Sequence, residues 1–456
     1  MLVAIVATFI VGYACIALEH PLKINKTATA LLLGVLVWTL YAFAHESFAG
    51  LLPEGETWTN ALTHHLGSTA EIVFFLLGAM TIVTLVDQYQ GFSIITDRIK
   101  TRNKRKLLWS LSIITFFLSA VLDNMTTAIV MVALLRKLIP TQKDRWVYAG
   151  MVILAANAGG AWSPIGDVTT IMLWIAGQVT TVNIMVKTFI ASFVCMVVPI
   201  VIICATPAMK GDFGEVAHVD GGIRIDKRFQ NLIFFVGIGL LIFVPIFKTI
   251  THLPPYLGML FGVAVLWVLT EILSRKHSKE EMKMPTAMET LTVIDTPSIL
   301  FFLGILMAVA CLETCGALGI LSKSLNDTFM GIHAGDEPIG FFIIDLLIGV
   351  ISSVVDNVPL VAASMGMYPI TGDEVMFATN HPFWEFLAYC AGTGGSLLII
   401  GSAAGVAVMG MEKIDFIWYL KNISWLALAG YIAGAIVFIL MDVTLFENIA
   451  WLRDLA

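Results

Sequence analysis

The sequence predicts an all-α, multi-pass membrane protein made of two inverted repeats, each with a re-entrant helical hairpin and a broken helix. Of its 456 residues, 58% are hydrophobic and only 13% are charged, whereas soluble domains carry about 25% charged residues. The same polar motifs also occur twice within apolar runs, with Asp-Asn pairs at 123–124 and 356–357. A transmembrane β-barrel does not fit, since strands of about ten residues with alternating polarity are not seen.

Apolar runs of about 20 residues, each long enough to cross about 30 Å of hydrocarbon, recur along the chain. The first run, 1–18, has no basic leading region and no small-residue cleavage site, so we expect a retained helix rather than a signal peptide. The predicted spanning segments are 1–18, 27–45, 69–87, 146–178, 183–206, 229–247, 255–273, 297–320, 382–411 and 418–441.

Two further apolar stretches, 107–137 and 338–370, are too long and too interrupted to be simple spans. Each carries its Asp-Asn pair near the middle, so each arm is long enough to cross only half of the membrane. Backbone that turns at this depth is tolerated where it is buried in protein or lines a cavity. We therefore expect two re-entrant helical hairpins with polar tips.

The distribution of basic residues tests this layout. If both hairpins return to the side from which they enter, all but four of the 26 Lys and Arg residues fall on one side of the membrane. If either hairpin crossed the membrane, every later loop would change sides and the asymmetry would largely disappear. The prediction is that both termini lie outside, that 107–137 opens to the cytoplasm and that 338–370 opens to the outside. The four exceptions are Lys187, Lys248, Lys323 and Arg453.

An internal repeat connects the two halves of the chain. The stretch "NAGGAWSPIGD" at 157–167 recurs as "GTGGSLLIIGS" at 392–402, and "FFLLG" at 74–78 recurs as "FFLG" at 301–304. The predicted spans that carry the second motif run in opposite directions, so the halves have inverted topology. Inverted repeats with interrupted helices that meet near the bilayer midplane are typical of secondary transporters.

The repeat divides the chain into five predicted regions. Scaffold helices precede the first repeat, a connector with further scaffold helices separates the two repeats, and a short tail follows. The boundaries are 1–68 for the N-terminal scaffold, 69–206 for repeat one with its broken helix at 146–178, 207–296 for the connector, 297–441 for repeat two with its broken helix at 382–411, and 442–456 for the tail.

The stretch 157–167 has the composition of a cation site. Gly159, Gly160, Pro164 and Gly166 cannot continue a helix smoothly. The unwound backbone frees carbonyl oxygens beside amide, hydroxyl and carboxylate side chains, and small hard cations prefer such oxygen ligands. The candidate ligands in this stretch, just after it and in its mirror image are Asn157, Ser163, Asp167, Thr169, Thr170, Thr393, Ser396 and Ser402.

Three aspartates, Asp123, Asp167 and Asp356, are predicted to lie near the midplane. Placing a carboxylate there costs at least about 2.5 kcal/mol, which favours a functional role over a purely structural one. Asn124 and Asn357 are explained equally well as helix caps that fix the hairpin tips. A buried carboxylate holds either a proton or a cation, and competition between the two would couple two ion fluxes.

The chain resembles the NhaD-type sodium/proton antiporters of the ion transporter superfamily. The resemblance rests on "LDNMTTAIVM", "NAGGAWSPIGDVTTIMLW", "SSVVDNVPLVAA" and "GTGGSLLIIGSAAGVAVMG", in this order over nearly the whole chain. It implies the inverted-repeat fold of that superfamily and expulsion of Na⁺ or Li⁺ in exchange for protons, with no cofactor and no enzymatic activity. The positions that match functional positions of the family are Asp123, Asn124, Thr126, Thr127, Asn157, Ser163, Asp167, Thr169, Thr170, Ser353, Asp356, Asn357, Ser396 and Ser402.

The resemblance also implies the setting of the protein. It indicates a homodimer in the lipid bilayer of a bacterial inner (cytoplasmic) membrane, with a scaffold part and a mobile transport part in each protomer. Nucleic acid is not expected as a partner.

Two alternatives stay open. A Na⁺- or proton-coupled anion carrier of the same superfamily, for dicarboxylates or arsenite, would need Arg, Lys or uncommitted helix N-termini at its site. No Lys or Arg is predicted to lie deep in any segment, and three buried carboxylates would repel an anion. An intramembrane aspartyl protease also needs paired aspartates, but the Tyr-Asp and Gly-x-Gly-Asp pattern of such enzymes is not present around Asp123, Asp167 or Asp356.

Overall fold

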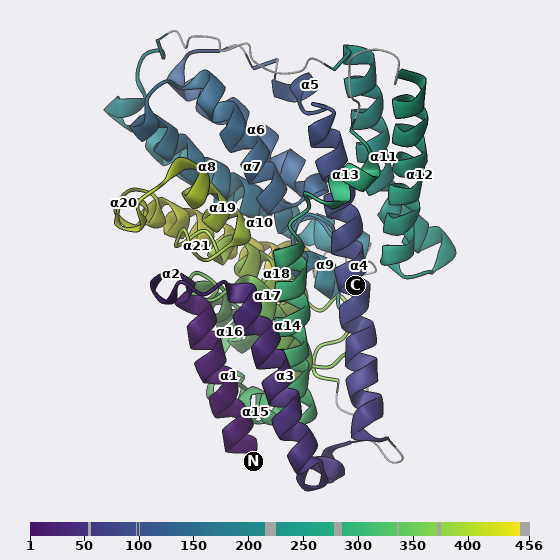
Figure 1. Ribbon diagram of the computed structural model, residues 1–456. Helices are drawn as coiled ribbons and strands as arrows, with labels where there is room; N and C mark the ends of the chain where they lie inside the picture. The colour runs from purple at the N-terminus through teal and green to yellow at the C-terminus, as the bar shows by residue number, and fades with distance from the viewer. Residues whose placement is uncertain are drawn as a thin grey trace.

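The computed structural model describes residues 1–52, 56–96, 98–99, 101–214, 225–277, 285–334, 337–371 and 375–446. These residues form an elongated bundle of helices (Figure 1). The first half contains α1 (Leu2–Ala17), α2 (Glu19–Leu22), α3 (Lys26–Ala44), η1 (His45–Leu51), α4 (Trp58–Gln88), α5 (Ser93–Thr96), α6 (Lys104–Leu122), α7 (Asn124–Leu138), α8 (Gln142–Gly160), α9 (Val168–Ile175), α10 (Thr181–Ala205) and η2 (Pro207–Met209).

The described residues of the second half are also mainly helical and include two short antiparallel strands, β1 (His333–Ala334) and β2 (Glu337–Pro338). Residues 447–456 of the predicted tail, with Arg453, lie outside the described residues. The helices are α11 (Lys227–Thr251), α12 (Pro255–His277), α13 (Ala287–Leu291), α14 (Thr296–Thr314), α15 (Ala317–Phe329), α16 (Gly340–Ile351), α17 (Asn357–Met367), α18 (Pro382–Gly394), α19 (Ala403–Glu412), α20 (Phe416–Asn422), α21 (Ser424–Met441) and η3 (Asp442–Phe446).

The predicted class of all-α, multi-pass membrane protein is confirmed. Within the described ranges, eight helices are long and apolar enough to cross a membrane. Large apolar side chains on the outer helices are exposed, including Phe43 on α3 at 82% and Phe235 on α11 at 65%. Such surfaces suit hydrocarbon rather than water. The eight helices are Lys26–Leu51, Trp58–Gln88, Lys104–Leu122, Thr181–Ala205, Lys227–Thr251, Pro255–Arg275, Thr296–Thr314 and Ser424–Thr444.

Three predicted spans differ from the observed helices. Helix α4 begins at Trp58, because the Thr57 hydroxyl accepts a hydrogen bond from the Asn60 N–H and caps it; the predicted boundary between 68 and 69 therefore falls inside a helix. The span 297–320 is interrupted because Gly316 has φ +77°, and the separate helix α15 follows. The span 418–441 consists of α20 and α21, which meet at Ile423.

In each predicted hairpin, the first helix begins close to the point where the second helix ends. In hairpin one (α6 and α7), the Tyr148 hydroxyl at the start of α8 donates to the Lys104 carbonyl, 2.7 Å away, at the start of α6. Arg145, also in α8, donates to the Ile139 carbonyl just after α7, over 3.0 Å. The first helix of hairpin one therefore begins where its second helix ends.

Hairpin two (α16 and α17) has the same form. The ring of Phe341, at the start of α16, lies 5.2 Å from that of His381, just before α18. The ring of Tyr368, just after α17, lies 5.1 Å from that of Phe383 in α18. Both pairs of helices thus fold back on themselves, and their re-entry into a membrane without crossing it stays a prediction.

Both broken helices are interrupted where the sequence predicts. Broken helix one (α8 and α9) is open over 161–167, and broken helix two (α18 and α19) is open over 395–402. Each packs against the first helix of its own hairpin through the same contact. The Ser119 hydroxyl donates to the Ala156 carbonyl over 2.6 Å, and the Ser352 hydroxyl donates to the Ala391 carbonyl over 2.8 Å. The halves thus repeat at the level of single hydrogen bonds, which supports the internal repeat.

A glycine in each broken helix permits this close packing. A Cβ on Gly159 would lie 2.2 Å from the Phe116 carbonyl oxygen, and a Cβ on Gly394 would lie 2.0 Å from the Gly349 carbonyl oxygen. Real Cβ atoms do not approach backbone oxygens so closely, so only glycine fits at either position. The crossing of hairpin and broken helix is therefore encoded in both repeats by a residue without a side chain.

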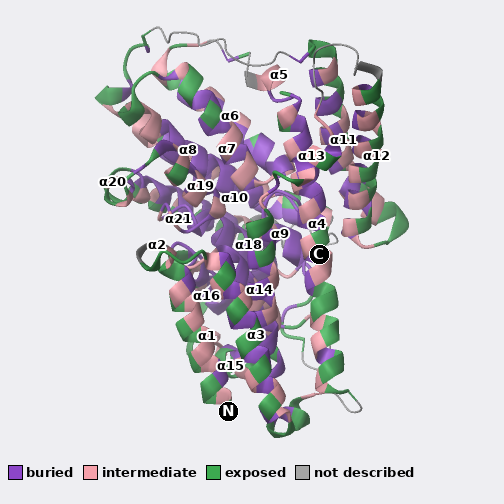
Figure 2. Ribbon diagram, viewed as in Figure 1, coloured by how far each residue is buried: buried purple, intermediate pink, exposed green. Residues whose placement is uncertain are grey.

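The interrupted helices form the interior of the molecule. Figure 2 shows buried residues concentrated around α8, α10 and α18, whereas α1, α3, α11 and α12 carry exposed positions along their outer faces. From Phe383 to Gly394, every residue of α18 is buried. The polar breaks of both repeats are thus enclosed by helices.

A cluster of charges holds hairpin one and broken helix two together. The carboxylate of Glu412, at the end of α19, accepts hydrogen bonds from Arg136 Nε over 2.6 Å and from Arg145 Nε over 3.0 Å. The Glu412 carbonyl also accepts from the side chains of Gln142 and Trp146. The Glu412 carboxylate is buried and is the counter-charge of both arginines. We therefore expect this cluster to stabilise the fold.

Replacing Glu412 by Gln should lower the free energy of unfolding by about 2 kcal/mol, since both guanidinium groups lose their counter-charge and Arg136 is half-exposed. Thermal unfolding of the detergent-solubilised protein, followed by tryptophan fluorescence, measures this change. The matched control is Glu271→Gln, which removes an exposed ion pair with Arg275 and should change stability by less than about 0.5 kcal/mol. Equal effects of the two substitutions would contradict a stabilising role for the cluster.

Candidate ion-binding site

Asp167 lies at the centre of a buried polar region. It is 2% exposed and precedes the first residue of α9. Its Oδ1 accepts a hydrogen bond from the Thr169 N–H over 3.1 Å, and the Thr170 hydroxyl completes a capping box. Its Oδ2 faces the tips of both hairpins and accepts from Asn124 Nδ2 over 2.8 Å and from Asn357 Nδ2 over 3.5 Å. One carboxylate therefore receives amide groups from both repeats.

Asn157 connects this carboxylate to broken helix two. Its Oδ1 accepts from Asn124 Nδ2 over 3.1 Å, and its Nδ2 donates to Ser396 Oγ over 2.9 Å and to Ser402 Oγ over 3.0 Å. Six predicted site residues thus belong to one hydrogen-bonded group, which we call the central polar cluster. Its members are Asn124, Asn157, Asp167, Asn357, Ser396 and Ser402.

Predicted site residues cap four helices. Asp123, Asp167, Asp356 and Ser402 are the N-caps of α7, α9, α17 and α19, and each side chain accepts a hydrogen bond from a backbone N–H of its helix. Helix N-termini carry partial positive charge. Because three of the four caps are carboxylates, these termini are already engaged by groups of the chain itself.

Asp123 lies at the tip of hairpin one but outside the central polar cluster. Its carboxylate accepts from the Thr126 N–H over 2.8 Å and from the Thr126 hydroxyl over 2.7 Å. It is partly exposed and has φ +121°, a conformation that costs a residue other than glycine about 1–3 kcal/mol and is often found at functional sites. The chain thus holds a carboxylate at a position that glycine would occupy more easily.

Asp356, the corresponding residue of hairpin two, forms an ion pair. Its Oδ2 lies 3.3 Å from Nζ of Lys26, the first residue of α3. No motif indicates this contact, because the partners are 330 positions apart and Lys26 belongs to no motif. The prediction that no Lys or Arg lies deep in a segment stays a prediction, because Lys26 is the first residue of α3 and Lys187 lies near the start of α10. Lys26 reaches a hairpin tip, and Lys187 is 4% exposed within α10 and donates to the Asn380 carbonyl over 3.3 Å.

The remaining predicted ligands fall into two groups. The hydroxyls of Ser163, Ser353 and Thr393 donate to backbone carbonyls and fix the local chain. The hydroxyl oxygens of Thr127 and Thr169 are buried and have no hydrogen-bond partner among the described residues. Buried polar atoms are normally paired, so these two hydroxyls are candidates for binding a ligand.

The arrangement supplies oxygen donors and one carboxylate without a basic partner. Among the ion pairs between described residues, none involves Asp167. The amide side chains around it can offer either an N–H or a carbonyl oxygen, and the serines can donate or accept. Such a site can hold a proton on Asp167 or surround a small cation with oxygen.

Comparison with known proteins identifies the family. Residues 13–384 match the protein family described as "Citrate transporter". The chain is 45% identical to Sodium/proton antiporter 1 of Arabidopsis thaliana over 446 residues, which cover 98% of this chain and 73% of that protein. It is 41% identical to Sodium/proton antiporter 2 of the same plant over 434 residues, covering 94% of this chain and 97% of that protein.

A bacterial relative agrees with these matches. The Na(+)/H(+) antiporter NhaD of Vibrio cholerae is 30% identical over an alignment 466 positions long. The alignment covers 95% of this chain and 90% of that protein. The similarity therefore extends over both repeats and the helices between them. The chain belongs to the family of the NhaD-type sodium/proton antiporters.

Proposed function

We propose that the protein is a secondary active antiporter that exchanges Na⁺, or Li⁺, for H⁺ across a membrane by alternating access. The observation that carries this proposal is the central polar cluster, in which Asp167 accepts amides from the tips of both hairpins. Inverted repeats that meet at one buried site are the architecture of secondary transporters. The relatives named sodium/proton antiporter support the choice of ions.

The proposed chemistry is competition for Asp167. With the carboxylate ionised, Na⁺ binds to it together with oxygens of Asn124, Asn157 and Asn357, whose amides rotate to present their carbonyl groups. The hydroxyls of Thr169 and Ser396 complete the oxygen shell. With the carboxylate protonated, the cation loses its counter-charge and leaves. One site therefore carries the two ions in alternation and not together.

The access change is proposed to be a movement of the interrupted helices against the outer helices. Hairpins one and two and both broken helices carry the ion, while α1, α3, α4, α11, α12 and α14 remain in place as the scaffold. We further propose a homodimer in the cytoplasmic membrane of a bacterium, with both termini outside.

An anion carrier is the second candidate, because the matching family is described as "Citrate transporter". The geometry favours a cation. Three helix N-termini that could bind an anion are capped by Asp123, Asp167 and Asp356, and these carboxylates would repel a substrate with several negative charges. Lys26, a basic residue that reaches a hairpin tip, is already paired with Asp356.

Proteoliposomes that contain the purified protein and an internal pH-sensitive dye test the proposal. An imposed Na⁺ gradient should drive proton movement in the opposite direction, and Li⁺ should replace Na⁺. Protein-free liposomes control for leak, and labelled citrate is supplied in parallel. Accumulation of citrate without Na⁺-driven proton movement would contradict the proposal and favour the anion carrier.

A further inference from the structure

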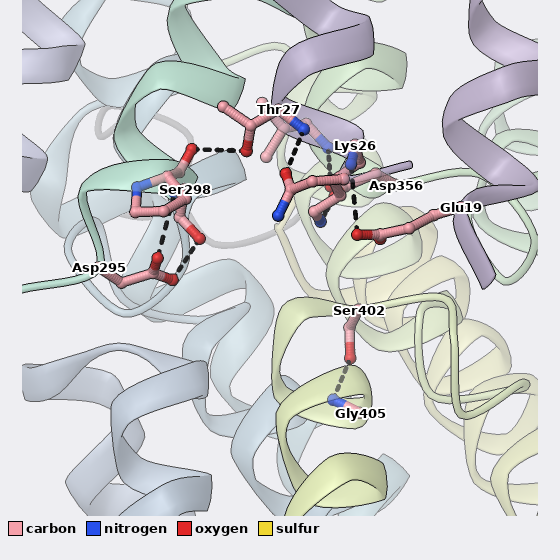
Figure 3. A network of polar contacts seen from close by, with 11 residues as sticks. Glu19, Lys26, Thr27, Asp295, Ser298, Asp356, Ser402 and Gly405 are labelled. Atoms are coloured by element: carbon pink, nitrogen blue, oxygen red, sulfur yellow. Dashed lines mark hydrogen bonds and ion pairs between the residues drawn. The ribbon is translucent and has the colours of Figure 1, made fainter. Parts of the chain in front are cut away.

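Lys26 connects α3 to the tip of hairpin two. Its Nζ lies 3.3 Å from Asp356 Oδ2 and 4.4 Å from the centroid of the Phe301 ring of α14. The two charged side chains are 24% and 15% exposed, so water screens the pair only in part. The Lys26 N–H donates to the Glu19 carboxylate over 3.2 Å, which fixes the start of the helix (Figure 3).

Helices α3 and α14 form one unit. The Thr27 hydroxyl donates to the Pro297 carbonyl over 2.9 Å, and the Trp38 indole donates to the Met307 carbonyl over 2.8 Å. A Cβ on Gly304 would lie 2.6 Å from the Leu31 backbone nitrogen, so the helices touch backbone to backbone. The ion pair of Lys26 therefore joins this rigid pair to the hairpin.

The two hairpin tips differ in this respect. Asp123 and Asp356 occupy equivalent places in the repeats and both cap the second helix of their hairpin. In the described part of the chain, Asp356 has an ammonium partner, whereas no ion pair involves Asp123. Helix α12, which packs on α4 as α3 packs on α14, begins with Pro255 where α3 begins with Lys26. The Lys26 ammonium thus pairs with only one of the two equivalent carboxylates, that of Asp356.

We propose that Asp356 is a second position for Na⁺, in addition to the site at Asp167, and that Lys26 is a tethered competitor of Na⁺ there. While the ammonium is paired with Asp356, hairpin two is held on the α3–α14 unit. The charge of the ammonium also keeps a second cation from binding the Asp356 carboxylate equally closely. When Na⁺ binds Asp356, Lys26 is displaced and the hairpin is released to move. Lys26 is thus a positioning residue that sets the apparent Na⁺ affinity. This inference rests on the proposed antiport function.

The test measures Na⁺-driven proton movement in proteoliposomes against Na⁺ concentration, at one alkaline pH where protons compete least. Lys26→Met should lower the half-saturating Na⁺ concentration by roughly threefold to tenfold, since a partly buried ion pair no longer has to be broken. Lys26→Arg keeps the charge and should stay within about twofold of the wild type. Lys23→Met, on the exposed turn just before α3, is the matched control and should not change.

The outcomes separate this inference from the antiport proposal. If the wild type shows no Na⁺-driven proton movement, the antiport function itself is wrong. If the wild type exchanges the ions but Lys26→Met leaves the half-saturating concentration unchanged or raises it, only the role of Lys26 is overturned. Lys26→Gln serves as a second neutral variant. Should neither neutral variant fold while Lys26→Arg does, the pair is structural and the inference fails.

Discussion

Asp167→Asn is expected to abolish Na⁺-driven proton exchange, with a loss on the order of 100-fold or more. The substitution removes the charge that binds the cation and the group that takes the proton, and one unit charge about 4 Å from a cation is worth on the order of several kcal/mol in a protein interior. Asparagine keeps the shape of the side chain and still caps α9 through its Oδ1. The protein should therefore fold while the transport activity is lost.

Proteoliposome flux at saturating Na⁺ measures this loss, and size-exclusion chromatography confirms that the variant folds. Asp415→Asn is the matched control, because Asp415 also caps a helix, α20, but is exposed and away from the central polar cluster. It should exchange ions at the wild-type rate. Unchanged Na⁺ dependence in Asp167→Asn would mean that another group carries the cation.

Gly394→Ala is expected to cause the largest loss of stability, at least about 3 kcal/mol. The added methyl carbon would lie 2.0 Å from the Gly349 carbonyl oxygen, and a backbone atom of a packed helix cannot turn aside as a flexible side chain can. Broken helix two would have to separate from hairpin two. Gly159→Ala should have a similar effect in the first repeat, since a Cβ there would meet the Phe116 carbonyl oxygen at 2.2 Å.

The yield of monodisperse protein and its thermal unfolding in detergent measure this effect. The control is Gly239→Ala in α11, where a Cβ would meet no atom within 4 Å. Alanine favours a helix over glycine by about 0.5–1 kcal/mol, so this variant should be as stable as the wild type or more so. A stable, well-folded Gly394→Ala protein would show that the broken helix and the hairpin can separate at low cost.

The architecture could be predicted because it follows from hydropathy and repetition. Apolar runs located the spanning helices, and the Gly-rich stretches located both breaks to within a few residues. Asn124, Asp167 and Asn357 are all among the predicted site residues, and hydrogen bonds join the Asp167 carboxylate to both amides. Patterns that occur twice are informative because both copies must satisfy the same packing.

Side-chain direction could not be predicted. The motifs predict the same role for Asp123, Asp167 and Asp356, yet of these three only Asp167 reaches the central polar cluster. Which way a capping carboxylate turns depends on neighbours distant in the sequence, such as Lys26 for Asp356. Glu412 was missed for the same reason, since its arginine partners lie about 270 positions earlier in the chain and the ends of helices carry no periodic signal.

The two oxygen atoms of the Asp167 carboxyl group have different roles. Oδ1 holds the first turn of α9 through the Thr169 N–H, while Oδ2 faces the hairpin tips. An ionised carboxylate caps a helix better than a neutral one, so protonation should loosen that first turn. Helix α9 packs on α17 and α4. Under the proposed function, the occupancy of the site would change the local order of a short helix that touches both hairpin two and α4.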